Sequence, residues 1–433
     1  MDAAPAPAGS DDAPGLRLHA IRGLRPAVAP DRVGALLCPP YDVIDADRRA
    51  RLLQADPDNA VGVVLPDPTP AGYAAAAAEL TDLVRRGVYA VDADPAIYVY
   101  EMRTPDGSAT RGLLGAVELR DPADGVILPH ENTMAGPVAD RLDVMTATGT
   151  DLEPIYLVYD GGGPASDAVR DVDSAPPAAE AVTPDGVVHR LWRLDDPTVW
   201  SRIAADLEPR HALIADGHHR YATYRERQRR EAGAQGPGPW DRGLTLLVDS
   251  SEYGPQVHAI HRVIPGLHLA DATAALDGVA RLDTVDTVDG DSGDLSSALA
   301  AAGGRDGFCA VLTDGTTAYL LADDRGRIAD AAAREGELPA LSALDVTVMH
   351  RGLVERVWSL TDDVDTVRYA HSIDEAVALA RESGGTAVLL RPTPVTAVAA
   401  VAAAGGRMPR KSTLFTPKPA SGLVMRRLAD EPA

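Results

Sequence analysis

The stretch Ala212-Leu-Ile-Ala-Asp-Gly-His-His-Arg-Tyr-Ala-Thr-Tyr224 gives the clearest indication of how this chain folds. Its first four residues, Ala212 to Ala215, form a short apolar run that is typical of a buried strand. The next two, Asp216 and Gly217, are a turn pair, and the residues from Arg220 onward favour a helix. The sequence therefore predicts a strand, a tight turn and the start of a helix in direct succession.

A helix that begins directly after a glycine turn presents unpaired backbone N–H groups and the positive end of its dipole to the turn, which favours phosphate. Gly217 lets the backbone approach a ligand closely. Asp216 can act as the helix N-cap or hold a metal ion or a hydroxyl group, and Arg220 can form a two-pronged contact with a phosphate. His218 and His219 complete a very polar cluster. The alternative is an ordinary capped helix with surface histidines.

Size and composition limit the possible functions. A chain of 433 residues exceeds a single typical core, so we expect two or three lobes. The net charge of −23 argues against a nucleic-acid partner, and any phosphorylated ligand must be held locally. Cys38 and Cys309 show no partner pattern, which predicts a reduced, cytoplasmic protein without disulfides or a cysteine zinc site. We expect residues 1–14 to be a disordered tail, and we expect no membrane partner, since no stretch reaches roughly 18 apolar residues.

Two further polar segments precede the central stretch. In Pro39-Pro-Tyr-Asp-Val43 the prolines fix an extended backbone that presents Tyr41 and Asp42 in a defined direction. The alternative is a strand that ends in a proline turn, with Asp45 capping a helix over 46–53. In the segment 127–141, His130 and Glu131 can supply a proton acceptor.

Near the end of that segment, Asp140 and Arg141 are either part of the site or a capping pair at the start of a helix over 142–148. The last polar segment, 405–423, concentrates basic and hydroxyl side chains in an acidic protein, which predicts an anion ligand. A solubilising basic tail is the alternative. Met408, Leu414 and Phe415 argue against it, because they indicate that the segment is anchored.

The remaining chain is interpreted as scaffold. We expect helices over 72–86 and 200–207, hairpins over 96–119 and 308–322, a loose excursion over 160–186 and an amphipathic helix over 342–360. The predicted fold class is α+β with mixed sheets. The expected organisation is the tail 1–14, an N-terminal and central catalytic region 15–265, and a C-terminal region 266–433 that closes the site.

Taken together, the polar segments resemble a bacterial and archaeal family known as domain of unknown function 1015. The resemblance is carried by Pro39 to Val43, His130-Glu131 with Thr133 and Asp140-Arg141, Ala215 to Arg220, and Met408-Pro with Lys411 to Thr413 and Pro417-Lys418. It covers almost the whole chain, and the family name conveys no activity.

Asp216-Gly-His-His-Arg220 also resembles the signature of free-serine kinases in the ParB and sulfiredoxin superfamily. This second resemblance implies a ParB/sulfiredoxin-like core around the strand, turn and helix. It implies that the residues from Gly217 to Arg220 hold nucleotide phosphates, that Asp216 orients a metal ion or the substrate hydroxyl, and that a glutamate is the base, for which Glu131 is the candidate. A Walker A motif is absent from the sequence, so any nucleotide would not be bound in the manner of a P-loop.

Three functions fit these residues. The first is a phosphotransferase that acts on a small hydroxylated metabolite such as an amino acid, with magnesium and ATP or ADP as possible cofactors. The second is a phosphomonoester hydrolase with His218 or His219 as nucleophile or general acid, including a transition-metal variant that uses His130, Glu131, Asp216 and His218. The third is a nucleotide-binding switch protein without turnover. The partner is a small phosphorylated or hydroxylated substrate, and the sequence leaves the oligomeric state open.

The candidate catalytic residues are Glu131, Asp216, His218 and His219. Asp216 is also the candidate magnesium ligand. The candidates for substrate or phosphate binding are Tyr41, Asp42, His130, Thr133, Asp140, Arg141, Gly217, Arg220, Thr223, Lys411, Ser412, Thr413 and Lys418.

Overall fold

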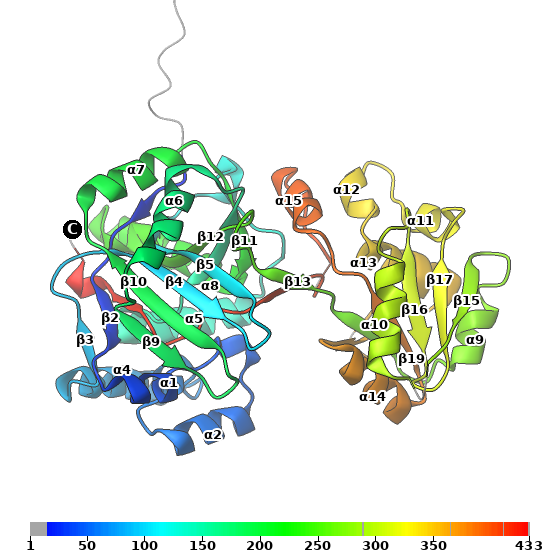
Figure 1. Ribbon diagram of the computed structural model, residues 1–433, viewed down its shortest axis with the longest axis horizontal. Helices are drawn as coiled ribbons and strands as arrows, with labels where there is room; N and C mark the ends of the chain where they lie inside the picture. Colours follow the sequence, from blue (N-terminus) through cyan, green and yellow to red (C-terminus); the bar gives the residue numbers. More distant parts are fainter. Residues whose placement is uncertain (1–14, 288–289, 364, 410, 432–433) are drawn as a thin grey trace, which may run out of the picture. The chain divides into compact units, whose positions relative to one another are not determined.

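The computed structural model describes residues 15–287, 290–363, 365–409 and 411–431, so the tail predicted over 1–14 lies outside the described residues. The chain forms two compact units (Figure 1). Unit 1 comprises Met1–Leu128, Thr133–Pro255 and Pro417–Ala433, and unit 2 comprises Pro129–Asn132 and Gln256–Thr416. The expected division at residue 265 differs from this grouping. Strand pairing decides where each segment belongs, and composition does not reveal that pairing.

Unit 1 is built on a mixed sheet that contains nine strands within the described residues. In sheet order the strands are β6 (Ile127–Leu128), β11 (Ala212–Asp216), β8 (Ile155–Tyr159), β12 (Arg242–Asp249), β5 (Ala109–Glu118), β4 (Ile97–Arg103), β10 (Val188–Leu194) and β9 (Ala179–Val182), with β1 (Leu18–His19) also paired to β5. Strand β8 runs parallel to β12 and β6 runs parallel to β11, whereas the other pairs are antiparallel. The α+β class with mixed sheets is therefore confirmed.

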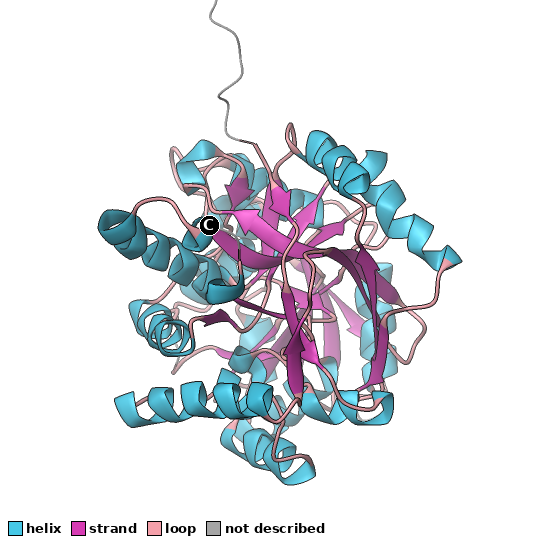
Figure 2. Ribbon diagram, turned by 90° about the vertical axis from the view of Figure 1, so that its left-hand side faces the viewer, coloured by secondary structure: helices cyan, strands magenta, loops and turns pink. Residues whose placement is uncertain are grey.

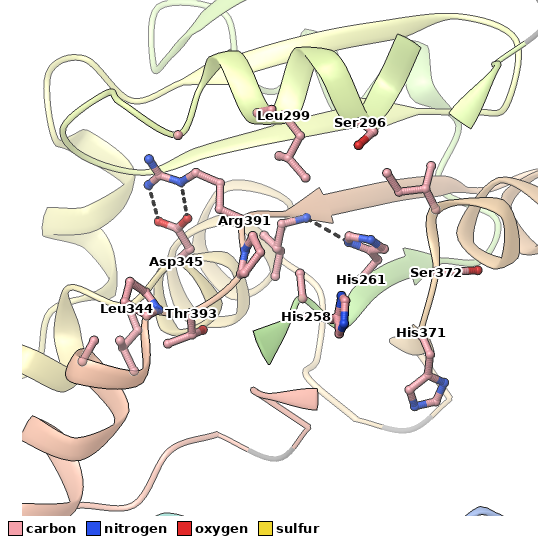
Figure 3. Close-up of a pocket in the computed structure, with 18 of the residues that line it drawn as sticks. His258, His261, Ser296, Leu299, Leu344, Asp345, His371, Ser372, Arg391 and Thr393 are labelled. Atoms are coloured by element: carbon pink, nitrogen blue, oxygen red, sulfur yellow. Dashed lines mark hydrogen bonds and ion pairs between the residues drawn. The ribbon is translucent and has the colours of Figure 1, made fainter. Parts of the chain in front are cut away.

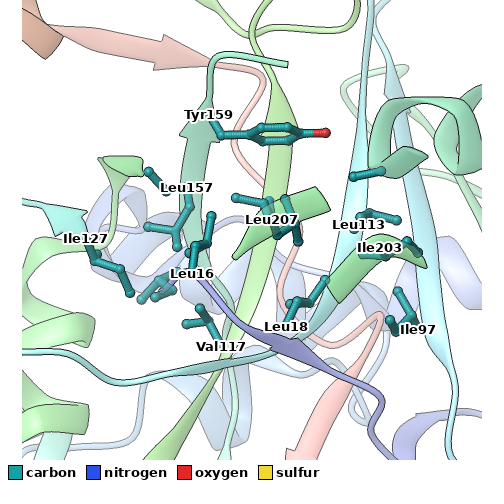
Figure 4. Close-up of a cluster of buried hydrophobic side chains, with 14 of the residues drawn as sticks. Leu16, Leu18, Ile97, Leu113, Val117, Ile127, Leu157, Tyr159, Ile203 and Leu207 are labelled. Carbon is teal, nitrogen blue, oxygen red and sulfur yellow. The ribbon is translucent and has the colours of Figure 1, made fainter. Parts of the chain in front are cut away.

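The main core of unit 1 lies between this sheet and its helices (Figure 4). Ile203 and Leu207 of α7 (Pro197–Leu207) are fully buried in the same cluster as Ile97, Leu113 and Leu157 from the sheet. Burial of each such side chain stabilises the fold by about 1.5–3 kcal/mol. This core fixes the position of β8 and β11, and therefore of the turn that follows β11.

A second sheet of unit 1 joins distant parts of the chain. Its order is β3 (Tyr89–Val91), β2 (Gly23–Pro26), β21 (Met425–Arg427) and β7 (Thr150–Asp151). The helices of unit 1 surround the two sheets (Figure 2). They are α1 (Pro30–Leu36), α2 (Ala46–Ala55), α3 (Val61–Val64), α4 (Pro70–Arg85), α5 (Ala135–Thr148), α6 (Gly163–Asp171), α7 and α8 (His218–Gln235).

Unit 2 contains an antiparallel sheet of six strands among its described residues. The order is β15 (Arg281–Val285), β17 (Ala318–Ala322), β16 (Cys309–Thr313), β19 (Thr386–Leu390), β14 (His261–Ile264) and β18 (Arg368–Ala370). Helices α10 (Ser292–Ala301) and α14 (Ile373–Ser383) pack their apolar residues into the core of this sheet. The other elements of the unit are α9 (Leu269–Ala274), α11 (Arg327–Ala332), α12 (Pro339–Ser342), α13 (Asp345–Thr347), α15 (Val395–Ala403) and the strand pair β13 (Gln256–His258) with β20 (Leu414–Thr416).

Most of the predicted elements are present, but two expectations are wrong. The excursion expected over 160–186 contains α6 and β9, because the apolar side of α6 packs into the main core. The single amphipathic helix expected over 342–360 is instead α13 followed by a π-helix over Val348–Val357. The spacing of apolar residues identifies a buried face, but it does not distinguish backbone bonds to the fourth residue from bonds to the fifth.

The buried histidine of β10, His189, gives unit 1 a pH-dependent stability. Its Nδ1 accepts a hydrogen bond from the Tyr100 hydroxyl at 2.8 Å, and its Nε2 lies 3.1 Å from Thr183 Oγ1. Burial lowers the pKa of His189 to about 4, although Asp185 acts in the opposite direction. The unfolded chain, with an ordinary histidine pKa near 6.5, therefore binds more protons between these two pKa values, and stability falls as the pH falls through that window.

We expect this histidine to account for about 2 kcal/mol of the loss of unfolding free energy between pH 7 and pH 5. The measurement is urea unfolding followed by tryptophan fluorescence at several pH values. In His189→Gln the slope of stability against pH should become shallower, whereas His258→Gln, an exposed control in unit 2, should keep the wild-type slope. An unchanged slope in His189→Gln would contradict the assignment.

Candidate functional site

The predicted strand, turn and helix start are present. Strand β11 ends at Asp216, Gly217 occupies the N-cap position with φ of 91°, and α8 begins at His218. No side chain caps the start of α8. The possibility that Asp216 caps this helix is therefore wrong, because the left-handed Gly217 takes that position. The positive end of the α8 dipole lies at this turn.

The guanidinium of Arg220 lies directly beneath Gly217. A Cβ at this glycine would come within 3.1 Å of Arg220 Cζ and Nε, in addition to the strain of a positive φ. Arg220 is 1% exposed and donates to the Pro154 carbonyl and to the Asp216 carboxylate. Within the described residues, its Nε is buried without a hydrogen-bond partner. Arg220, which the sequence predicts to bind a phosphate, therefore also packs against the turn at Gly217.

Lys418 connects Asp216 to the Pro-Pro-Tyr-Asp segment. Its Nζ lies 2.7 Å from Asp216 Oδ1 and 3.1 Å from Asp42 Oδ2. Burial by itself would lower the pKa of Lys418, but the charges of Asp216 and Asp42 outweigh it and raise the pKa above its usual value. Lys418 therefore stays cationic, and three of the predicted site residues from distant parts of the sequence meet in unit 1.

Glu153 is a buried member of this cluster that the sequence interpretation missed. Its Oε1 accepts hydrogen bonds from the Tyr41 backbone N–H at 3.0 Å and from Ser421 Oγ at 2.9 Å. Its charge and that of Asp216 help to raise the pKa of Arg220 against the effect of burial. The available signal is an acidic residue two positions before the apolar run of β8.

Tyr41 packs its ring against Arg141, whose guanidinium carbon lies 4.3 Å from the ring centroid. Arg141 also donates to Asp140 and to the Val64 carbonyl, and Asp140 Oδ1 accepts from the Tyr73 hydroxyl at 2.8 Å. Burial raises the pKa of Tyr41 to about 12, although Arg220 acts in the opposite direction. Tyr41 is therefore a protonated hydroxyl at neutral pH.

The alternative in which Asp140 and Arg141 cap a helix over 142–148 is wrong, because α5 begins at Ala135 with Met134 as its N-cap. The backbone N–H of Met134, directly after Thr133, donates to His219 Nε2 at 3.1 Å. His218 is buried at the first position of α8.

Thr223 is fully buried, and its hydroxyl lies 2.8 Å from the His219 carbonyl, to which it donates. The same hydroxyl also lies 3.3 Å from the Val138 carbonyl, so Thr223 connects α8 to α5.

The other candidates lie in unit 2. His130 Nε2 lies 3.2 Å from Thr413 Oγ1, and the His130 carbonyl accepts from the Met408 N–H at 2.8 Å. Ser412 is buried and donates to the Pro409 carbonyl at 2.5 Å. The Lys411 carbonyl accepts from Arg262 at 2.9 Å. The segment is anchored as expected, and it meets the His-Glu segment.

The predicted residues thus form two groups. Unit 1 holds Tyr41, Asp42, Thr133, Asp140, Arg141, Asp216, Gly217, His218, His219, Arg220, Thr223 and Lys418, and unit 2 holds His130, Glu131, Lys411, Ser412 and Thr413. That Glu131 and Asp216 belong to the same site remains a prediction.

A metal ion would find few ligands in either unit. Within the part of the chain that the structure describes, no three His, Cys, Asp or Glu residues are placed to hold one. Two carboxylates, Asp42 and Asp216, meet at Lys418. Mg²⁺ is commonly held by one or two carboxylates together with substrate phosphates, so this pair suits that ion better than a transition metal. In the same part of the chain, no helix has the length and apolar character needed to cross a membrane.

A family model described as "Protein of unknown function (DUF1015)" matches residues 18–373. The chain belongs to this family. Among solved structures, a free serine kinase variant in complex with ADP is similar over 67% of this chain and 84% of that chain, with 11% identity and a TM-score of 0.32. SbnI with C-terminal truncation from Staphylococcus aureus is similar over 73% of this chain and 88% of its own, with 13% identity and a TM-score of 0.35.

A conserved hypothetical protein from Pyrococcus furiosus is similar over 70% of this chain and 93% of its own, with 13% identity and a TM-score of 0.31. The comparison with curated proteins gave no match.

Proposed function

We propose that this protein is a phosphate-handling enzyme, and specifically a phosphotransferase that acts on a small hydroxylated metabolite such as an amino acid. The observation that carries the proposal is the start of α8, where Gly217 takes the N-cap position in the left-handed conformation next to the buried Arg220 guanidinium. An eighteen-residue helix directs its positive dipole end to this point. We further propose that β11, the turn and α8 belong to a ParB/sulfiredoxin-like core.

In this proposal each group has a separate task. The positive dipole end of α8 and the charge of Arg220 stabilise the transferring phosphate, and Lys418 holds the two carboxylates in place. Bound Mg²⁺, held by Asp42 and Asp216, would neutralise phosphate charge.

We propose that Glu131 is the general base. A phosphotransferase needs a group that accepts the proton of the substrate hydroxyl. The segment Asp216-Gly-His-His-Arg220 resembles the signature of free-serine kinases. ATP and ADP are therefore the first nucleotides to test, and free serine is the first acceptor to test.

Phosphomonoester hydrolysis by a histidine nucleophile has less support. His219 Nε2 already accepts a hydrogen bond from the Met134 N–H, so the lone pair that a nucleophile would use is engaged. A switch protein without turnover would share the phosphate site and would bind nucleotide without forming product. The assay described below for Asp216 separates these functions.

We expect the wild-type protein to bind ADP and Gly217→Ala to bind it at least about 10-fold more weakly. A residue other than glycine at this φ costs about 1–3 kcal/mol, and the new Cβ meets the Arg220 guanidinium. Isothermal titration with ADP, in the presence and absence of Mg²⁺, measures the Kd, and thermal shift reports binding independently.

Gly233→Ala is the matched control, because it lies in the same helix with open space around its Cβ position. This variant should keep the wild-type Kd. Lys418→Met serves as a second variant if Gly217→Ala fails to fold, and we expect it to weaken ADP binding as well. Equal ADP affinity in wild type, Gly217→Ala and Lys418→Met would overturn the proposed site.

A further inference from the structure

A large cavity in unit 2 has no role in the proposed phosphate site. It has a volume of about 960 Å³ and is lined by residues of β13, β14, β19, α10, α12, α13, α14 and α15 and the loops next to them (Figure 3). This volume lies at the upper end of the range for pockets that bind small molecules. Most of the lining is apolar, including Leu299, Ala300, Leu344, Ile373, Leu390 and Ala397.

The charged side chains of the lining compensate each other. Arg391 and Asp345 are the only Lys, Arg, Asp or Glu residues among the described residues that line the cavity. Arg391 contacts both carboxylate oxygens of Asp345, at 2.7 and 2.8 Å. Its remaining N–H groups donate to the carbonyls of Ala302, Arg305 and Gly307, so all five donors are used. This pair offers no uncompensated charge to an ionic ligand.

His261 supplies a hydrogen-bonding group to the cavity. Its Nδ1 accepts a hydrogen bond from the Leu390 N–H at 3.2 Å (Figure 3). A nitrogen that accepts carries no proton, so the neutral ring holds its proton on Nε2. Burial and the neighbouring charge of Arg262 lower the pKa of His261 to about 4, which keeps the ring neutral at pH 7. His261 is 5% exposed and lines the cavity, and Nε2 has no hydrogen-bond partner among the described residues.

A donor that lines a mainly apolar cavity gains a hydrogen bond when a ligand supplies the acceptor. We propose that this cavity binds an uncharged, mainly apolar small molecule whose carbonyl or ring-nitrogen acceptor takes the His261 Nε2 proton in a hydrogen bond. Apolar walls bind the body of the ligand, and the His261 donor selects its orientation. A carboxylate or phosphate ligand is disfavoured, because Arg391 has no donor left to pair with it. This site is independent of the proposed phosphotransfer.

The test uses propionyl-dimethylaminonaphthalene, a neutral fluorescent ketone whose emission reports an apolar surrounding. Its comparators are dimethylaminonaphthalene without the ketone and the anionic anilinonaphthalene sulfonate. We expect the full-length protein to bind the ketone more tightly than either comparator. In His261→Phe, loss of one hydrogen bond should weaken ketone binding by about 3- to 10-fold and leave binding of the ketone-free probe unchanged. If His261→Phe fails to fold, His261→Ala replaces it.

A cavity-filling variant locates the probe. Ala300 is exposed to the cavity on α10, so Ala300→Trp should fill the space without disturbing the core, and should weaken ketone binding at least about 10-fold. Ala175→Trp is the matched control, since Ala175 is an exposed alanine that lines a separate cavity of about 460 Å³ in unit 1. This control should bind like wild type. Unchanged ketone binding in Ala300→Trp, tighter binding of the sulfonate, or equal loss of both neutral probes in His261→Phe would each overturn the proposal.

Discussion

Replacing Asp151 by asparagine is expected to lower the unfolding free energy of unit 1 by about 3–5 kcal/mol. Asp151 ends β7 and is fully buried. One carboxylate oxygen lies 2.6 Å from Arg227 Nη1, and the other lies 2.9 Å from Arg426 Nη1 and accepts from the Leu244 N–H at 3.2 Å. Both arginines are buried, so asparagine would leave two guanidinium groups with less opposite charge in a region that water does not reach.

The same carboxylate also joins distant segments of the chain. Arg426 lies in β21, which pairs with both β2 and β7, and its guanidinium also donates to the carbonyls of Arg242 and Pro239. Glu431 approaches Arg426 to 3.4 Å from the end of the described chain. Loss of the Asp151 charge therefore weakens the attachment of the C-terminal segment to unit 1.

Urea unfolding followed by tryptophan fluorescence measures this loss, because Trp192, Trp200 and Trp240 all lie in unit 1. The control is Asp195→Asn, which removes an exposed carboxylate paired with Arg193. An exposed pair contributes about 0–1 kcal/mol, so this variant should remain close to wild type. A loss below about 1 kcal/mol in Asp151→Asn would show that the buried network does not hold unit 1 together.

Local elements were predictable where the sequence itself encodes them. The strand before Asp216, the glycine turn and the helix after it are as predicted, as are the hairpin that became β4 and β5 and the helix that became α4. In each case the signal is a run of apolar residues, a turn residue or a helical period over adjacent positions. The π-helix over Val348–Val357 was missed, since its hydrogen-bond spacing has no such signal.

Long-range organisation was only partly predictable. The return of the chain to unit 1 at Pro417 depends on pairing of β21 with β2 and β7, and no local pattern records which strands pair. For the site, residue types identified Asp42, Asp216 and Lys418, which meet through one ammonium group. Glu153 was missed because its role comes from its buried partners rather than from a motif.

The sharpest test of the proposed chemistry is Asp216→Asn, which we expect to reduce turnover by at least about 10²-fold while the protein stays folded. Asparagine keeps the shape of the side chain, but it removes the charge that pairs with Arg220 and Lys418. The assay incubates the protein with ATP, Mg²⁺ and a set of hydroxylated amino acids that includes free serine. It follows ADP and the phosphorylated product by phosphorus NMR.

A second readout, the reactivity of Lys418, separates catalysis from simple loss of structure in Asp216→Asn. The Asp216 charge is the largest of the contributions that raise the pKa of Lys418, so its removal should lower that pKa and increase the reaction of Lys418 with amine-modifying reagents at neutral pH. The control is Asp160→Asn, because Asp160 directly follows β8 in the same sheet and its carboxylate is 84% exposed. Asp160→Asn should keep the wild-type rate and the wild-type Lys418 reactivity. A wild-type rate in Asp216→Asn would remove Asp216 from the reaction, and ADP binding without product in the wild-type protein would favour a nucleotide switch over a phosphotransferase.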